Sequence, residues 1–213
     1  VIIGSSALYS ALAVRSSVIL GKDAGRGMDY GESDVLIGSG VMANAYNTSL
    51  NIVMGYLAGA LLTGIQDRQA RSNIIIGANA GKNMSQGPQY NIIMGYDCAN
   101  QTTNSYSCIY LGVECAANNN GEYNIFLGHQ CGADLDSAYE KSGDYNIYIG
   151  KDTAKYNTGS NNIFIGNDVD NGSSTVGDTE TSRSYLLKIS SLISGITGPL
   201  ASDKQLHFHS DIL

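Results

Sequence analysis

A short run of apolar residues recurs along most of the chain, and its cleanest copy is Asn162-Ile163-Phe164-Ile165-Gly166. The pattern of asparagine, three apolar residues and glycine occurs ten times with variations. Its closing glycines, 16 to 22 residues apart, are Gly4, Gly21, Gly38, Gly55, Gly77, Gly95, Gly112, Gly128, Gly150 and Gly166. Such a period is typical of a solenoid, whose repeats bury apolar surface by stacking on their neighbours. Residues 1–170 are therefore predicted to form a parallel β-solenoid (a β-roll) of about ten coils, in an all-β protein.

Each apolar run is expected to be a strand, whose side chains alternate between two faces. The first and third residues of each run are predicted to point into the coil, and the middle residue outward. A row of ten large apolar residues is too long to leave in water, so we expect another copy of the chain to cover it. The bulkiest middle residues are assigned to this subunit interface: Ile75, Ile93, Tyr110, Phe126, Tyr148 and Phe164.

Two further columns follow the repeat. Three residues after each glycine stands a small residue, predicted to fill a tight inward corner. Three of the four cysteines (Cys98, Cys115 and Cys131) fall in this column, which favours a core role over a redox or metal role. The asparagines before the strands are predicted to form a structural hydrogen-bonded ladder, in which Cys108 takes one asparagine position.

Two repeats are about five residues longer than the others, and the pattern stops after Gly166. The insertions, 61–72 and 133–144, are predicted to be surface loops that bind a receptor. Their candidate binding residues are Arg68, Arg71, Asp134, Asp136 and Glu140. Residues 171–213 are predicted to form a small β-rich cap or linking module, with strands at 185–189 and 205–209. The polar stretches 100–104 and 118–121 are expected on the solvent side of the coils.

Composition excludes several partners. A net charge of −7 with only 12 Lys and Arg gives no basis for nucleic-acid binding. No stretch approaches the roughly 18 apolar residues of a membrane span, so membrane insertion is not expected. The chain starts inside a repeat and is interpreted as a segment of a longer protein.

Candidate chemistry is sparse. Carboxylates recur two residues after the glycine, at Asp23, Asp97, Glu114, Asp152 and Asp168. They are interpreted as turn residues, with glycan hydrolysis and cation binding as alternatives. No catalytic residues are assigned and no cofactor is required. His207 and His209 lie on the strand predicted at 205–209 and share a face, so three chains around an axis would bring six imidazoles together. That set would suit an octahedral metal such as iron; the alternative is a pair of exposed histidines.

The repeat resembles the head of YadA-type trimeric autotransporter adhesins, where an Asn-Ser-Val-Ala-Ile-Gly phrase builds a parallel β-roll. The bulkier phrase at residues 146–168 is more similar to repeats in bacteriophage tail fibres. This repeat is about 17 residues long rather than about 14, and its middle strand residue is large. The resemblance, over roughly residues 1–170, implies a homotrimer that attaches to cells; some phage fibres also hold iron through His-x-His motifs.

The sequence thus favours a non-enzymatic segment of a trimeric phage tail fibre, located in the virion tail and binding a bacterial surface glycan or outer-membrane protein. The alternatives are a bacterial trimeric adhesin head at the cell surface and a polysaccharide depolymerase. A fourth possibility, ice binding, would require a flat face rich in threonine, and no column of the repeat has one.

Overall fold

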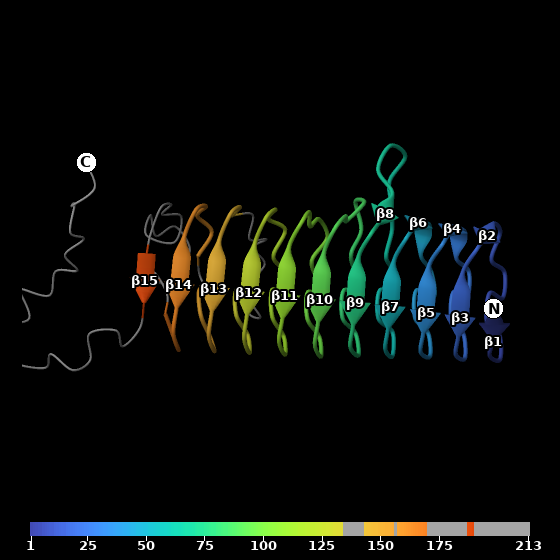
Figure 1. The fold of residues 1–213 in the computed structure, drawn as a ribbon, viewed down its shortest axis with the longest axis horizontal. Helices are drawn as coiled ribbons and strands as arrows, with labels where there is room; N and C mark the ends of the chain where they lie inside the picture. The colour runs from blue at the N-terminus through green and yellow to red at the C-terminus, as the bar shows by residue number, and fades with distance from the viewer. Residues whose placement is uncertain (134–142, 156, 170–186, 190–213) are drawn as a thin grey trace, which may run out of the picture.

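The ten apolar runs form ten adjacent strands of one parallel sheet, stacked side by side along a straight axis (Figure 1). The computed structural model describes residues 1–133, 143–155, 157–169 and 187–189. The ten strands are β1 (Ile2–Ile3), β3 (Val18–Leu20), β5 (Val35–Ile37), β7 (Ile52–Met54), β9 (Ile74–Ile76), β10 (Ile92–Met94), β11 (Ile109–Leu111), β12 (Ile125–Leu127), β13 (Ile147–Ile149) and β14 (Ile163–Ile165). Their in-register pairing confirms the predicted solenoid, with nine turns between β1 and β14 over roughly 43 Å of axis.

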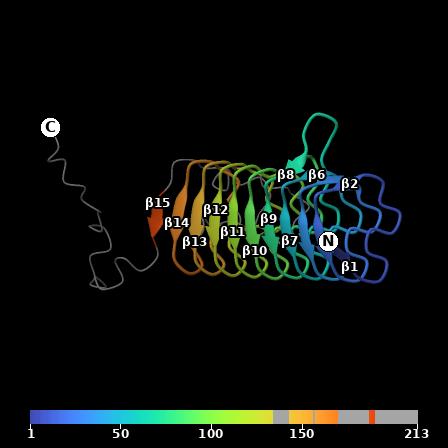
Figure 2. The ribbon, with the colours of Figure 1, turned by 45° about the vertical axis from the view of Figure 1, so that its right-hand side comes forward.

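A second, shorter parallel sheet is formed by the residues that stand just before the asparagine column. Its strands are β2 (Val14–Arg15), β4 (Asp29–Glu32), β6 (Tyr46–Ser49) and β8 (Ala70–Arg71). Isolated bridges continue it from Arg71 to Gln89 and from Gln89 to Tyr106. Figure 2 shows the coils as a continuous stack of loops of similar outline. The described residues contain no helix, and accordingly none that could cross a bilayer.

The predicted orientation of the strand residues is wrong. The middle residues of the main-sheet strands from β3 to β14 are almost fully inaccessible to solvent, and they fill the inside of the coil. Their exposed fractions are 0% for Ile75, Ile93, Tyr110, Phe126 and Phe164 and 1% for Tyr148. The first and third residues of the strands point outward instead. The six residues assigned to a subunit interface are therefore core residues of a single chain.

The reason for the reversal lies in the asparagine column. Asn91, for example, stands two residues before the middle residue Ile93, and alternation places both on the same face of the strand. Inside the coil, the large middle residues supply volume and the asparagines bond to one another. The rings of Tyr110, Phe126, Tyr148 and Phe164 stack in sequence there, with centroids 5.2, 4.5 and 5.3 Å apart.

The closing glycines have a steric cause. A Cβ built on Gly95 would lie 2.0 Å from the carbonyl oxygen of Gly112 in the next coil, and Gly95 has a φ of +140°. Only glycine combines that close backbone approach with a positive φ.

The predicted small corner column is confirmed. From Ala24 to Thr153 its members are fully buried. The expectation for the polar stretches 100–104 and 118–121 is partly wrong, because Thr102 and Asn119 are buried. They bond inside the coil: the Thr102 hydroxyl donates to the Ala116 carbonyl, and the Asn119 Oδ1 accepts from the Gly121 N–H.

The strand predicted at 185–189 is present as β15 (Leu187–Ile189), which pairs in parallel with β14. It adds an eleventh strand to the main sheet, so this part of the predicted C-terminal module continues the solenoid sheet. The strand predicted at 205–209, with His207 and His209, lies outside the described residues.

Candidate interaction surfaces

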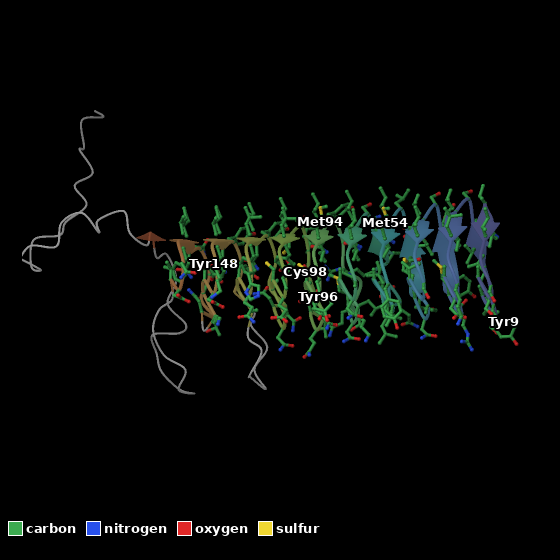
Figure 3. All side chains as sticks on the ribbon, turned by 90° about the horizontal axis from the view of Figure 1, so that it is seen from below. Tyr9, Met54, Met94, Tyr96, Cys98 and Tyr148 are labelled. Atoms are coloured by element: carbon green, nitrogen blue, oxygen red, sulfur yellow. The ribbon has the colours of Figure 1, made fainter. Side chains whose placement is uncertain are left out.

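The outer face of the main sheet is an uninterrupted aliphatic surface, here called the aliphatic face. None of its nineteen side chains is buried and none is polar or charged. Its first column is Val18, Val35, Ile52, Ile74, Ile92, Ile109, Ile125, Ile147 and Ile163. Its second column is Ile3, Leu20, Ile37, Met54, Ile76, Met94, Leu111, Leu127, Ile149 and Ile165. In Figure 3, Met54 and Met94 stand on one side of the row of strands, whereas Cys98 and Tyr148 lie on the other.

The exposure of this face is substantial. Ile52 and Met94 are each 40% exposed and Ile163 is 38% exposed, although each stacks on neighbours along the axis. Two columns about 10 Å wide over about 43 Å give a strip on the order of 400 Å² or more in plan. Apolar patches of several hundred Å² are often functional contact surfaces, so this strip, which no polar side chain interrupts, is a candidate interaction surface.

The asparagine ladder runs through the interior beside the strands and confirms its predicted structural role. At Asn51, Asn73 and Asn91, the backbone N–H and the side-chain Nδ2 both donate to the Oδ1 of the preceding ladder residue, and at Asn146 and Asn162 the backbone N–H makes this bond. Asn73 donates to Asn51 over 3.0 and 2.9 Å, and Asn91 to Asn73 over 3.1 and 2.9 Å. The Nδ2 also donates to a carbonyl of the following coil, as from Asn73 to Pro88.

The four cysteines are free thiols in the interior, as the sequence predicted. Cys98, Cys115 and Cys131 follow one another in the corner column, and each thiol donates to a strand carbonyl. Burial is the main reason why the pKa of Cys115 is raised well above its ordinary value. A thiol that stays protonated in a closed core is a poor nucleophile and a poor metal ligand.

The first long insertion forms a hairpin that stands out from the rod beside β8 (Figures 1 and 2). Its two sides are joined by hydrogen bonds between Ile65 and Arg68. Neighbouring coils hold its base: Asn47 Nδ2 donates to the Ile65 carbonyl over 3.1 Å, and the Gly87 N–H donates to the Thr63 carbonyl over 2.9 Å. This placement agrees with the prediction of a surface loop.

Arg68 and Arg71, the predicted binding residues of this loop, turn toward two tyrosines of the following coils. The Arg68 guanidinium lies over the ring of Tyr106, with its Cζ 5.6 Å from the ring centroid, and the Arg71 guanidinium lies 5.4 Å from the Tyr90 centroid. The Tyr90 and Tyr106 rings meet edge to face at 5.5 Å. We call these four residues the arginine–tyrosine ledge.

Sequence reasoning missed the tyrosine part of the ledge. The ring of Tyr106 meets the ring of Tyr123 edge to face, with centroids 5.4 Å apart. The ring of Tyr123 in turn stacks on that of Tyr145, with centroids 4.8 Å apart. A signal was present, because Tyr90, Tyr123 and Tyr145 all stand five residues before a closing glycine. The other predicted binding residues, Asp134, Asp136 and Glu140, lie outside the described residues.

The acidic column after the glycines consists of turn residues with local partners. Asp97, Glu114 and Asp152 have φ values of 50 to 54°, a left-handed conformation that aspartate tolerates better than most residues. Glu114 accepts a hydrogen bond from Gln130, and Asp152 pairs with two lysines. The hydrogen bonds from Lys151 and Lys155 lower the pKa of Asp152. Within the described ranges, no group of three or more His, Cys, Asp or Glu residues is arranged to hold a metal ion.

Comparison with protein families, with curated proteins and with solved structures gives no match for this chain.

Proposed function

We propose that the chain is a non-enzymatic structural and attachment segment of a trimeric fibre. The observation that carries the proposal is the aliphatic face, which follows the whole length of the solenoid on its outer side. A rigid rod with one adhesive side is suited to lateral assembly with copies of itself. The tail-fibre-like repeat supports threefold assembly and a place in a virion tail. The same fold also fits the alternative, a bacterial trimeric adhesin head.

The proposal of a non-enzymatic role rests on how the surface carboxylates of the acidic column are used. The residues of the acidic column lie in turns and form ion pairs, whereas the other repeated residues stack one coil on the next. Depolymerase activity, a further alternative, would require two carboxylates placed across a bound glycan. Attachment instead needs an extended support that carries a protruding element, and the hairpin beside β8 is such an element (Figure 2).

The proposal is tested by multi-angle light scattering on the purified protein. We expect a mass of three chains, each of 22.5 kDa. Replacing Ile92 and Ile147 by Asp should shift the mass toward one chain, because unpaired charges in an apolar contact oppose assembly. The matched control is Ser39→Asp, at an exposed position just after a closing glycine, which should leave the mass unchanged. A soluble, folded wild-type monomer would refute the assembly proposal.

A separate measurement tests attachment. Fluorescently labelled protein should bind to cells of a bacterial panel, and a variant with the hairpin 64–69 replaced by a short turn should bind more weakly with an unchanged mass. Equal binding by the shortened variant would place attachment elsewhere in the protein.

A further inference from the structure

Three arginines of the described chain stack on tyrosine rings, and one of them differs from the other two. Arg26 lies over Tyr9 and has the carboxylate of Asp23 at 3.8 Å. Arg68 and Arg71 form no ion pair with any carboxylate among the described residues. In a chain of net charge −7, two cations that lie over neighbouring rings without an acidic partner form a local positive site.

The stacking leaves part of the donor edge of each guanidinium unused, whereas the Nε of Arg71 is buried and makes no hydrogen bond with the described residues. Each guanidinium carbon lies 5.4–5.6 Å from its ring centroid, and the N–H groups of a guanidinium lie in its plane, where a carboxylate or phosphate can bind with two parallel hydrogen bonds. One terminal nitrogen of Arg68 donates to Asn104 Oδ1 over 3.3 Å, and one of Arg71 donates to the Tyr90 hydroxyl over 2.6 Å. Each group has five N–H donors, so most of them are not used by these bonds.

The ledge is also pre-organised. A Cβ on Gly87 would lie 2.6 Å from both the Cγ and the carbonyl oxygen of Arg68, so the glycine provides the space that Arg68 occupies. On the other side, Gln89 Nε2 donates to the Gln69 carbonyl over 3.0 Å and fixes the second side of the hairpin. Little conformational freedom remains to be lost when a ligand binds, which favours affinity.

The tyrosines extend the ledge along the rod. Tyr90, Tyr123 and Tyr145 are 40%, 39% and 56% exposed, and successive ring contacts from Tyr90 to Tyr145 carry the row across four coils. Tyrosine offers a rigid, amphipathic contact surface with a hydroxyl that donates and accepts hydrogen bonds. A linear row of such groups with cations at one end is suited to a linear, hydroxyl-rich, acidic polymer.

We infer that the arginine–tyrosine ledge binds an acidic glycan, with a carboxylate or phosphate of the sugar chain on Arg68 and Arg71 and the chain lying along the tyrosines. This inference rests on the attachment function proposed above and names the chemical class of its receptor. The rod itself stays assembled through the aliphatic face, which is a different surface.

The test is a titration of the full chain with soluble polysaccharides, followed by calorimetry. The probes are polygalacturonate for carboxylates, a phosphomannan for phosphates, and neutral dextran as the uncharged reference. Wild-type protein should bind one of the acidic polymers more tightly than dextran, with an affinity that falls as salt increases. The double variant Arg68→Gln and Arg71→Gln should lose about tenfold or more in affinity, since two charge-assisted contacts are removed.

The matched control is Arg26→Gln, which removes a stacked arginine that already has an acidic partner and should leave the affinity unchanged. Light scattering on each variant separates this inference from the proposed assembly, because the double variant should keep the wild-type mass. The inference is overturned if the wild type binds neither acidic polymer, or if the double variant binds as tightly as the wild type. A changed mass in the double variant would assign the ledge to a contact between copies and would equally overturn it.

Discussion

At the scale of single residues, Asp34 is the most unusual member of the interior. It occupies an asparagine position of the ladder and is fully buried. Its Oδ1 accepts from the Asn51 N–H and Nδ2 over 2.9 and 3.0 Å, as an asparagine oxygen would. Its Oδ2 accepts from the Thr48 hydroxyl over 2.9 Å, at the place where an asparagine would present its Nδ2. Burial raises the pKa of Asp34 above its usual value despite these hydrogen bonds.

The raised pKa fixes how stability depends on pH. The unfolded chain releases this proton at the ordinary pKa of an aspartate, near 4, and the folded chain releases it at a higher pH. The contribution of Asp34 to the free energy of unfolding is therefore fully present below about pH 4 and is lost as the pH rises through the folded pKa.

Replacing Asp34 with Asn should remove that loss. We expect Asp34→Asn to raise the free energy of unfolding at pH 7 by on the order of 1–3 kcal/mol, because a buried charge is replaced by an amide that extends the ladder. At pH 4 the gain should be smaller. Urea unfolding at both pH values and one fixed protein concentration measures this. Asn73→Asp is the mirror control and should destabilise more at pH 7 than at pH 4; a less stable Asp34→Asn variant at pH 7 would contradict the argument.

At the scale of elements, the ladder shows which parts of the fold are readable from sequence. Strand positions, coil number and the small corner column follow from the period, because each coil repeats the same steric demands. The direction of the strand side chains was predicted wrongly because both rows are apolar, and hydrophobicity alone does not say which row is inside. The distance in sequence from the buried asparagine decides which row is inside. Phe126 stands two residues after Asn124 and shares its face, whereas Ile125, one residue after Asn124, points to the other face.

Cys108 interrupts the ladder, and its thiol only partly replaces an amide. Its Sγ donates to the Gly121 carbonyl over 3.4 Å and accepts from the Asn124 N–H over 3.3 Å. An asparagine here could donate to both Asn91 Oδ1 and the Gly121 carbonyl, the pattern seen at Asn73.

Cys108→Asn should therefore stabilise the protein by about 0.5–1.5 kcal/mol, the net value of an added hydrogen bond. The midpoint of thermal or urea unfolding would show the gain. Cys115→Asn is the control in the corner column, where a larger polar side chain has little room, and it should destabilise. Loss of stability in Cys108→Asn would mean that the added volume outweighs the new bonds.

At the scale of the whole molecule, the candidate sites were less predictable than the fold. Arg68 and Arg71 were predicted as binding residues from the sequence because the hairpin lengthens its repeat. The tyrosines that receive them come from later coils, so only the stacking of repeats reveals the ledge. An apolar outer row was predicted and is present, but the row that forms it was exchanged for the row that fills the core; that a partner covers it stays a prediction.

This exchange yields the clearest test of the whole rod, because two neighbouring residues should behave in opposite ways. Phe126 is fully buried and stacks on Tyr110 and Tyr148, so Phe126→Asp places an unpaired charge inside the coil. We expect it to cost well over 3 kcal/mol and to unfold or aggregate the protein.

Ile125 lies on the same strand but points to the outer face, where it is only partly buried. Ile125→Asp, combined with the same change at Ile109 on the adjacent coil, should keep the β-sheet circular dichroism spectrum and lower the mass measured by light scattering. The two aspartates would also repel each other across adjacent strands, which adds to the cost of burying them between copies. If Ile125→Asp with Ile109→Asp instead unfolds the chain while Phe126→Asp is tolerated, the inside and outside of the solenoid are assigned the wrong way round.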